Sequence, residues 1–323
     1  MELTWRPLSK ADIPAVTALR AAVEAVDRTG HIVSEDDVAF EFADSDLDFP
    51  EGSLGVLDGD ELVGYGLVRV RGNAVDVHRC HLEGAVRPSH RRTGIGGELV
   101  QRLIACARVV HRSFYADLPL VVQMLVREKN EGHRALATAL GFTDDRRFYD
   151  MQVSLDAPVP VQPVDAGLAI VPYTRDRDEE VRLARNDAFA DHWGTTAASP
   201  EVWAERYTGM KSFVAGTSFL MVDKDSGAVV GFVLCQHSEA EYAASGVREL
   251  WVADVGTLRP YRGRGVAGAL LSCALAAGRD AGFERAALSV DSANSTPALG
   301  VYERAGYRVV GYWSDYGLPV SSG

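Results

Sequence analysis

Two short glycine-containing segments of this chain have residue types and spacing suited to holding a phosphate group. Arg262-Gly263-Arg264-Gly265-Val266-Ala267 and Arg91-Arg92-Thr93-Gly94-Ile95-Gly96 both fit the pattern R-x-x-G-x-[GA]. Each follows an apolar, strand-like run and opens an amphipathic, helix-like run. A glycine turn at a helix start presents unpaired backbone N–H groups beside the positive end of the helix dipole, which suits a pyrophosphate. Because the pattern occurs twice, it predicts a duplicated domain that binds a phosphate-bearing cofactor.

The elements that must position the two turns also occur twice. Pro7 has a counterpart in Pro172 and Gly141-Phe142 in Gly306-Tyr307, and the matched pairs are 165 to 171 residues apart when the turns are included. A chain of 323 residues is long enough for about two domains. Three prolines between Asp156 and Pro163 favour an extended connector. We therefore predict an N-terminal domain over 1–156, a proline-rich linker over 157–167 and a C-terminal domain over 168–323.

Each half has the same predicted order of elements. A strand and a helix lead to a β-hairpin and a further strand, which runs into the glycine turn. The helix after the turn has apolar residues at helical spacing, for example Ile95, Leu99 and Leu103. A strand, a second helix and a closing strand complete the half. This order predicts an α/β architecture, an α+β mixed sheet that carries helices.

Composition excludes several classes of partner. Lys and Arg number 33 against 45 Asp and Glu, and this net charge of −12 argues against nucleic-acid binding. The 4 cysteines are far apart, without the spacing of a metal site or a disulfide framework. No apolar run approaches the ~18 residues that span a bilayer, and the first residues do not resemble a signal peptide. We expect a cytoplasmic protein with no membrane partner and no metal, and the sequence gives no indication of its oligomeric state.

Two familiar nucleotide-binding motifs do not fit the turns. A Walker loop needs a lysine after its glycine, where this chain has no such residue. A Rossmann motif follows the first strand directly, whereas these turns follow several strands. The remaining fit is the acetyl-CoA site of the GNAT acyltransferase superfamily. The chain resembles that family in the turn, in the strand before it (Asp254 to Thr257, and Gly84 to Val86) and in the downstream run from Asn294 to Tyr307.

The resemblance implies two tandem GNAT acyltransferase domains that use acetyl-CoA (coenzyme A) as cofactor. The backbone of the strand would pair with the pantetheine arm as an added strand edge, and N–H groups of the turn would hold the pyrophosphate. The cofactor-binding residues that it implies are Val255, Gly256, Thr257, Arg262, Gly263, Arg264, Gly265, Val266, Ala267 and Asn294 in the second half, and Val86, Arg91, Arg92, Thr93, Gly94, Ile95 and Gly96 in the first.

The resemblance also implies the chemistry, which is direct N-acetyl transfer to a primary amine of a small molecule within a ternary complex. Tyr302 occupies the family's acid position, and its phenol suits protonation of a departing thiolate. The general base is expected on the strand before the turn, where Glu249 and Asp254 are the acidic candidates. Alternation places residues five apart on opposite faces unless a bulge intervenes, so we expect one of them to face the cleft and prefer Glu249.

The two halves are not equivalent at the acid position. Four residues before the glycine, the second half has Tyr302 and the first has Ala137, which cannot protonate a thiolate. We therefore expect catalysis in the C-terminal half and a degenerate N-terminal half. The segment from Asp191 to Gly194 and the region of Trp203 are candidates for acceptor contacts. Because the architecture also resembles the mycothiol synthases, mycothiol synthesis is one alternative, and a non-catalytic CoA-sensing protein is another.

Overall fold

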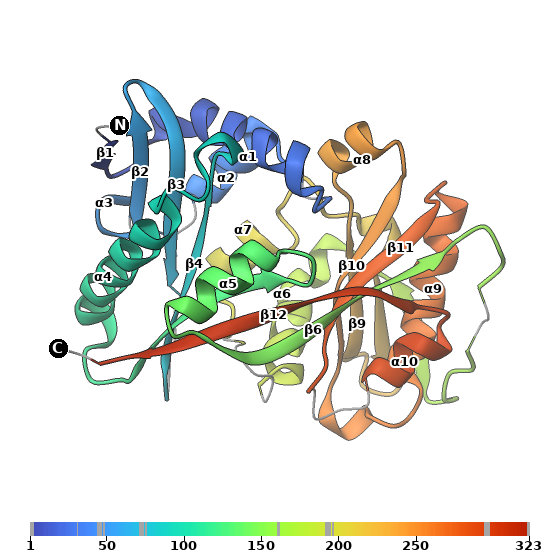
Figure 1. Ribbon diagram of the computed structural model, residues 1–323. Helices are drawn as coiled ribbons and strands as arrows, with labels where there is room; N and C mark the ends of the chain where they lie inside the picture. The colour runs from blue at the N-terminus through green and yellow to red at the C-terminus, as the bar shows by residue number, and fades with distance from the viewer. Residues whose placement is uncertain are drawn as a thin grey trace. The chain divides into compact units, whose positions relative to one another are not determined.

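The structure, a computed structural model, describes residues 3–30, 32–43, 47, 49–70, 74, 76–159, 162–190, 195, 197–293 and 298–321 (Figure 1). The chain forms two compact units, Met1–Arg147 with Trp313–Gly323, and Phe148–Tyr312. These units differ from two halves cut at residue 156, because each contains a segment from the other half of the chain.

The first unit contains a mixed sheet in the order β1-β2-β3-β4-β5-β12. Its strands are β1 (Leu3–Arg6), β2 (Ser53–Asp58), β3 (Glu61–Val70), β4 (His78–Val86), β5 (Leu120–Arg127) and the last part of β12 (Arg308–Val320). Its helices are η1 (Lys10–Asp12), α1 (Ile13–Asp27), α2 (Glu35–Phe42), α3 (Phe49–Gly52), η2 (Pro88–His90), α4 (Ile95–Tyr115) and α5 (Glu131–Ala139).

Helices cover both faces of this first sheet. The helix after the turn, α4, buries Ile95, Leu99 and Leu103 in one core, as their helical spacing predicts. On the other face α1 contributes Val16 and Leu19 to a second core with α2 and β3. Burial of one apolar stripe per helix is what holds such a layered unit together.

The second unit repeats the arrangement, with strands in the order β6-β11-β10-β9-β8-β7. Its strands are the last part of β6 (Thr143–Ser154), β7 (Leu168–Pro172), β8 (Phe219–Asp223), β9 (Val229–Gln236), β10 (Glu249–Thr257) and β11 (Arg285–Asp291). Its helices are η3 (Arg175–Arg177), α6 (Asp178–Ala188), α7 (Pro200–Arg206), η4 (Ala215–Thr217), α8 (Glu239–Ser245), η5 (Arg259–Tyr261), α9 (Val266–Asp280) and α10 (Ala298–Arg304).

Two cores also enclose the second sheet. On one face, Leu270 and Leu271 of α9 pack with Leu250 of β10. On the other face, α6 and α7 pack against β9, where Trp203 and Phe232 lie in the same core. The strand that precedes the glycine turn therefore lies between α9 and α6, and its side chains alternate between these two surroundings.

The closing strand of each half pairs within the unit built mainly by the other half. Residues 148–154 of β6 pair antiparallel with β11 in the second unit. Residues 313–320 of β12 pair antiparallel with β5 in the first unit. Leu155, just before the predicted linker, is 2% exposed in the core of the second unit. Each closing strand thus belongs to the unit with whose sheet it forms hydrogen bonds, and not to the unit formed by the residues that precede it in the chain.

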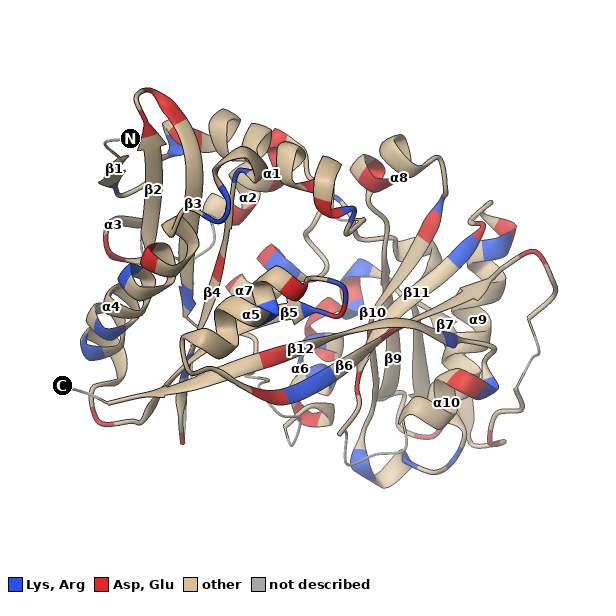
Figure 2. Cartoon of the chain, in the orientation of Figure 1, with Lys and Arg blue, Asp and Glu red and all other residues tan. Residues whose placement is uncertain are grey.

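Charged residues of both signs are interspersed along the elements (Figure 2). Across the described ranges, no helix is long and apolar enough to cross a membrane. Within those same ranges, no cluster of three or more His, Cys, Asp or Glu side chains has the arrangement of a metal site.

Candidate active site

The strand before the second turn separates from its parallel neighbour. The pairs described between β10 and β11 run from Glu249 to Trp251, whereas β10 continues to pair with β9 as far as Thr257. A register shift between Val252 and Asp254 marks a β-bulge, which bends a strand locally. The edge of residues 255–257 that faces away from β9 therefore has no β11 partner in the described pairing. An extended group such as a pantetheine arm can pair there.

The glycine turns have the same backbone path in both units. In the second unit, Gly263 and Gly265 have φ of 76° and 78°, and Gly265 is the N-cap of α9. In the first unit, Arg92 and Gly94 have φ of 63° and 94° at the same places before α4. The first N–H groups of α9 and α4 have no intrahelical acceptor, so both turns present donors to an anion.

The first arginine of each motif has a positioning role. Arg262 donates to the carbonyl oxygens of Thr257 (3.1 Å) and Ala188 (2.8 Å). Arg91 donates likewise to Val86 (3.1 Å) and forms an ion pair with Asp27 (2.6 Å). Each guanidinium thereby ties the end of a strand to the first helix of its unit. Backbone N–H groups, rather than these side chains, remain for a phosphate.

Residues of the interdomain segment lie against the second turn. Asp165 accepts from Arg264 at 2.8 Å. A Cβ added to Gly268 would lie 2.1 Å from the side-chain oxygen of Gln162, and one added to Gly265 would lie 3.6 Å from the carbonyl oxygen of Pro163. The predicted linker therefore contacts the first turn of α9, and the carboxylate of Asp165 lies beside Arg264 of the glycine turn.

Asp254 lies on β10 beside Arg185 of α6. Its carboxylate oxygen Oδ1 is 3.7 Å from Nε of Arg185 on α6. Burial raises the pKa of Asp254 to about 6, and Arg185 opposes that rise. A carboxylate with a pKa near 6 is largely ionised at neutral pH and can still accept a proton.

Tyr302, on α10, is electrostatically coupled to this carboxylate. Burial first, and the charge of Asp254 second, raise the pKa of Tyr302 to about 12. The phenol is therefore protonated at neutral pH. Its ring is partly buried against the core around α9 and makes an edge contact with Tyr307, with ring centroids 6.0 Å apart. A protonated phenol can donate to a departing thiolate.

Glu249 has different surroundings at the start of β10. Its Oε2 accepts from Nε of Arg285 in a close ion pair and from Gln152 at 3.3 Å. The bulge lies between Glu249 and Asp254, and the register implies that both lie on the same face of the strand. Simple alternation would place these two residues on opposite faces of the strand. The bulge is the exception named in the sequence analysis, and it is present here.

Ala137 has the same backbone setting as Tyr302. Phe142 N–H donates to the Ala137 carbonyl at 3.0 Å, as Tyr307 N–H does to Tyr302 at 3.1 Å. Ala137 is fully buried in the first unit's core. The first unit therefore presents a methyl group where the second presents a phenol.

Several residues singled out in the sequence contribute packing or cannot be described. Trp203 is 2% exposed, and its indole N–H donates to Asp178 at 2.9 Å. The side chains of Ile95 and Val266 are buried in the two cores, so only their backbone can meet a ligand. Asn294 and the segment 191–194 lie outside the described residues. The sequence analysis did not identify Arg185 as a site residue. The one indication in the sequence is that Arg185 lies 165 positions after Arg20, the same spacing as between Pro7 and Pro172.

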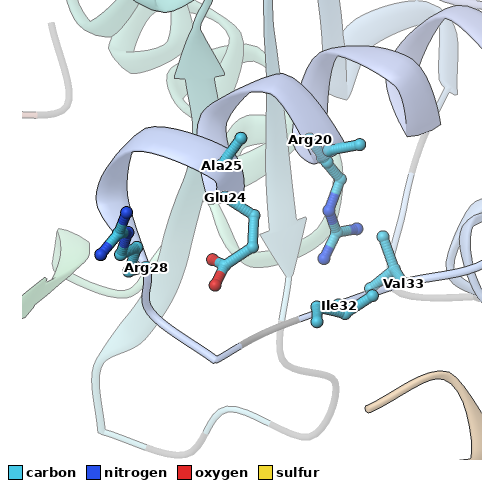
Figure 3. A pocket seen from close by; sticks show the side chains of 7 residues that line it. Arg20, Glu24, Ala25, Arg28, Ile32 and Val33 are labelled. Carbon is cyan, nitrogen blue, oxygen red and sulfur yellow. The ribbon is translucent and has the colours of Figure 1, made fainter. Parts of the chain in front are cut away.

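A pocket of about 400 Å³ lies in the first unit, between α1 and the segment after it (Figure 3). Arg20, Glu24 and Ile32 are among the residues that line it. Its polar groups have partners, since Arg20 pairs with Glu41 at 2.6 Å and Glu24 accepts from the Gly30 N–H at 2.7 Å. It contains none of the predicted catalytic residues.

Known proteins match the chain over both copies. The Acetyltransferase (GNAT) family matches residues 19–142 and 180–307. A mycothiol acetyltransferase of Thermobispora bispora is 29% identical over 263 residues, which are 80% of this chain and 81% of that protein. A GCN5-related N-acetyltransferase structure from Sphaerobacter thermophilus has a TM-score of 0.76 at 25% identity, covering 98% and 95% of the two chains. A tandem GNAT protein from the clavulanic acid biosynthesis pathway shares the fold, with a TM-score of 0.71 at 18% identity, covering 100% and 99%.

These matches confirm three predictions from the sequence: the family, the mixed α/β fold with two copies, and the enzyme class. The family covers more than half of the chain, and its two matched segments each contain one glycine turn. The chain belongs to the GNAT acetyltransferase family, as a tandem-domain N-acetyltransferase.

Proposed function

We propose that this enzyme transfers the acetyl group of acetyl-CoA directly to the primary amine of a small molecule, within a ternary complex in the second unit. The observation that carries the proposal is the juxtaposition, beside one glycine turn, of an acid and a base of suitable pKa. Asp254 has a pKa of about 6 and Tyr302 of about 12. Each group thus has the protonation state that its role requires at neutral pH.

Acetyl-CoA supplies an activated thioester, and the residues of the second unit fit it. Gly263 and Gly265 have left-handed backbone and are exposed, so a pyrophosphate can approach their N–H groups. Residues 255–257 offer an edge to the pantetheine arm. A backbone N–H of this edge would also stabilise negative charge on the thioester oxygen.

In the proposed reaction the amine nitrogen attacks the thioester carbon, forming a C–N bond. Asp254 accepts the proton that the nitrogen loses. The C–S bond then breaks, and Tyr302 protonates the departing thiolate. This assignment gives the base role to Asp254 rather than to Glu249. Glu249 is held in a close, direct ion pair with Arg285 at the far end of the strand, whereas Asp254 is 3.7 Å from Arg185 and has a raised pKa.

We also propose a division of labour between the two units. The second unit, Phe148–Tyr312, would be catalytic. The first would be non-catalytic, because it has Ala137 at the acid position and because Glu83, which corresponds to Asp254 by the register, pairs with Arg69 at 2.8 Å. Its glycine turn, Arg91 to Gly96, would still suit a CoA molecule.

Acetylation in the making of mycothiol is a second candidate for the reaction. It is favoured by the similarity to a mycothiol acetyltransferase across 80% of the chain. The amino-thiol pseudodisaccharide precursor of mycothiol is therefore the first acceptor to test, beside other small amines.

The test is a mass-spectrometric screen of acetyl transfer from acetyl-CoA to that precursor, a panel of small amines and peptide N-termini. We expect an acetylated small amine, and we expect Tyr302→Phe to lose ~10²–10⁴-fold in kcat while it still binds acetyl-CoA. Acetyl-CoA binding with no transfer to any acceptor would favour a CoA-sensing protein. A product that forms equally fast with Tyr302→Phe would remove Tyr302 from the mechanism.

A further inference from the structure

We propose that Arg185 is a positioning residue for the reaction, because its fixed guanidinium keeps Asp254 ionised and oriented as the general base. The inference rests on the proposed function of Asp254. It assigns a role to a helix residue that no motif in the sequence identified.

Two aromatic rings pack against the guanidinium of Arg185. Its central carbon lies 5.1 Å from the ring centroid of Phe189 and 5.0 Å from that of Tyr207. The residue is 7% exposed. A buried guanidinium that lies over two aromatic rings gains cation–π attraction and has little freedom to turn away. Its position relative to α6 is therefore set by the aromatic residues around it.

The two rings are themselves tied to the rest of the unit. Tyr207 stacks on Trp203, with centroids 4.6 Å apart and planes 16° apart. Phe189 lies 6.4 Å from Phe232 on β9. A Cβ on Gly256 would lie 2.2 Å from the Phe232 ring, so the absence of a side chain at Gly256 makes room for that ring beside β10. The packing therefore connects the arginine to the strand that carries the base.

From this position the arginine reaches the carboxylate. Nε of Arg185 and Oδ1 of Asp254 are 3.7 Å apart, a distance at which an opposite charge favours the ionised carboxylate. The charged group that acts on the pKa of Asp254 is Arg185 from α6, whereas Tyr302 from α10 has its own pKa raised by the charge of Asp254. Burial raises the pKa of Asp254 to about 6 even with the arginine present. Without the arginine the pKa of Asp254 would rise further, and a larger fraction of the carboxylate would be protonated at neutral pH.

In the described part of the first unit, the corresponding groups have different direct partners, although the charge of Glu83 also acts on Arg20. Arg20 pairs with Glu41 at 2.6 Å. Glu83, in the position of Asp254, pairs instead with Arg69 on β3 and is 46% exposed. The residue of β9 that corresponds to Arg69 is the neutral Gln236. The second unit, which has Tyr302 at the acid position, is thus also the unit in which Arg185 of the first long helix pairs with Asp254 of the strand before the turn.

The test follows the titration of Asp254 directly, by carboxyl ¹³C NMR of protein labelled at aspartate. The Asp254→Asn variant identifies the signal. We expect a midpoint near pH 6 in the wild type, and a midpoint about 1–3 pH units higher in Arg185→Gln. Arg185→Met, whose apolar side chain can pack against the rings, is the second neutral variant. Arg185→Lys retains the charge and should keep the midpoint within about half a unit of the wild type.

A kinetic measurement then links the titration to the reaction. With acetyl-CoA and the acceptor found in the screen, the ratio of kcat/KM between Arg185→Gln and wild type should be lowest at and below pH 6. It should rise toward one as the pH passes the raised midpoint measured for the variant. A uniform loss at every pH, or an unchanged NMR midpoint in both neutral variants, would overturn the inference and leave Arg185 a packing residue. Absence of transfer by the wild type would instead count against the proposed function, because the NMR result does not depend on turnover.

Discussion

We predict that a buried pair of histidines makes the stability of the first unit depend on pH. Nδ1 of His78 on β4 lies 2.9 Å from Nδ1 of His111 on α4, and the two residues are 0% and 1% exposed. Burial, followed by repulsion from His111, lowers the pKa of His78 to about 4, and burial also lowers that of His111. Both rings are therefore neutral in the folded state at pH 7.

The sign and size of the effect follow from linkage. A histidine in the unfolded chain titrates near pH 6.5, so between pH 6.5 and 4 the unfolded state binds more protons than the folded state. The contribution of the neutral histidines to the free energy of unfolding is fully present above pH 6.5 and is lost as the pH falls toward 4. For His78 alone, a pKa of about 4 corresponds to a loss of about 2 kcal/mol in the free energy of unfolding at pH 5.

The assay is urea-induced unfolding of the wild type and of His78→Asn at pH 7.5 and pH 5.0. The wild type should lose about 2 kcal/mol more than the variant on acidification, because the carboxylates titrate alike in both proteins. Asparagine has no ionisable group, yet it can still hydrogen-bond with His111. Equal losses in the two proteins would refute the argument that the pair is held neutral by burial.

Two further predictions concern the second glycine turn. Gly263→Ala should lower the free energy of unfolding by about 1 kcal/mol, because φ is 76° and a Cβ there meets nothing within 4 Å, so only backbone strain is added; an unchanged urea midpoint would contradict this. Asp165→Asn should tighten acetyl-CoA binding a few-fold in calorimetry, since it removes a carboxylate that pairs with Arg264 at 2.8 Å; Asp156→Asn is the matched control, and equal or weaker binding by the first variant would contradict the expected competition.

Much of the fold could be predicted from local patterns in the sequence. The two turns, the helices that follow them and the order of elements depend on spacings within about 20 residues, as with Ile95, Leu99 and Leu103. The difference between Ala137 and Tyr302 also follows from counting back from a glycine. These features are fixed by short-range geometry, which the sequence expresses directly.

Features that depend on partners far along the chain could not be predicted. β6 pairs with β11 and β12 pairs with β5. The two sheet edges are similar and both strands follow a glycine–aromatic pair, so the local sequence does not indicate which edge each strand joins. The bulge near Ala253 appears only when β10 is paired with β9. The same holds for Asp254, whose surroundings depend on Arg185, 69 residues earlier in the sequence. Long-range packing decided each of these, and sequence periodicity contains little of that information.

The central claim is that Asp254 of the second unit is the general base, and a comparison of three matched variants tests it most directly. The variants are Asp254→Asn, Glu249→Gln on the same strand and Glu83→Gln at the corresponding place in the first unit. The measurement is the rate of acetyl transfer at saturating acetyl-CoA. We predict a loss of ~10²–10⁴-fold for Asp254→Asn and less than about tenfold for the other two. Full activity of Asp254→Asn, or a comparable loss in Glu83→Gln, would contradict the account.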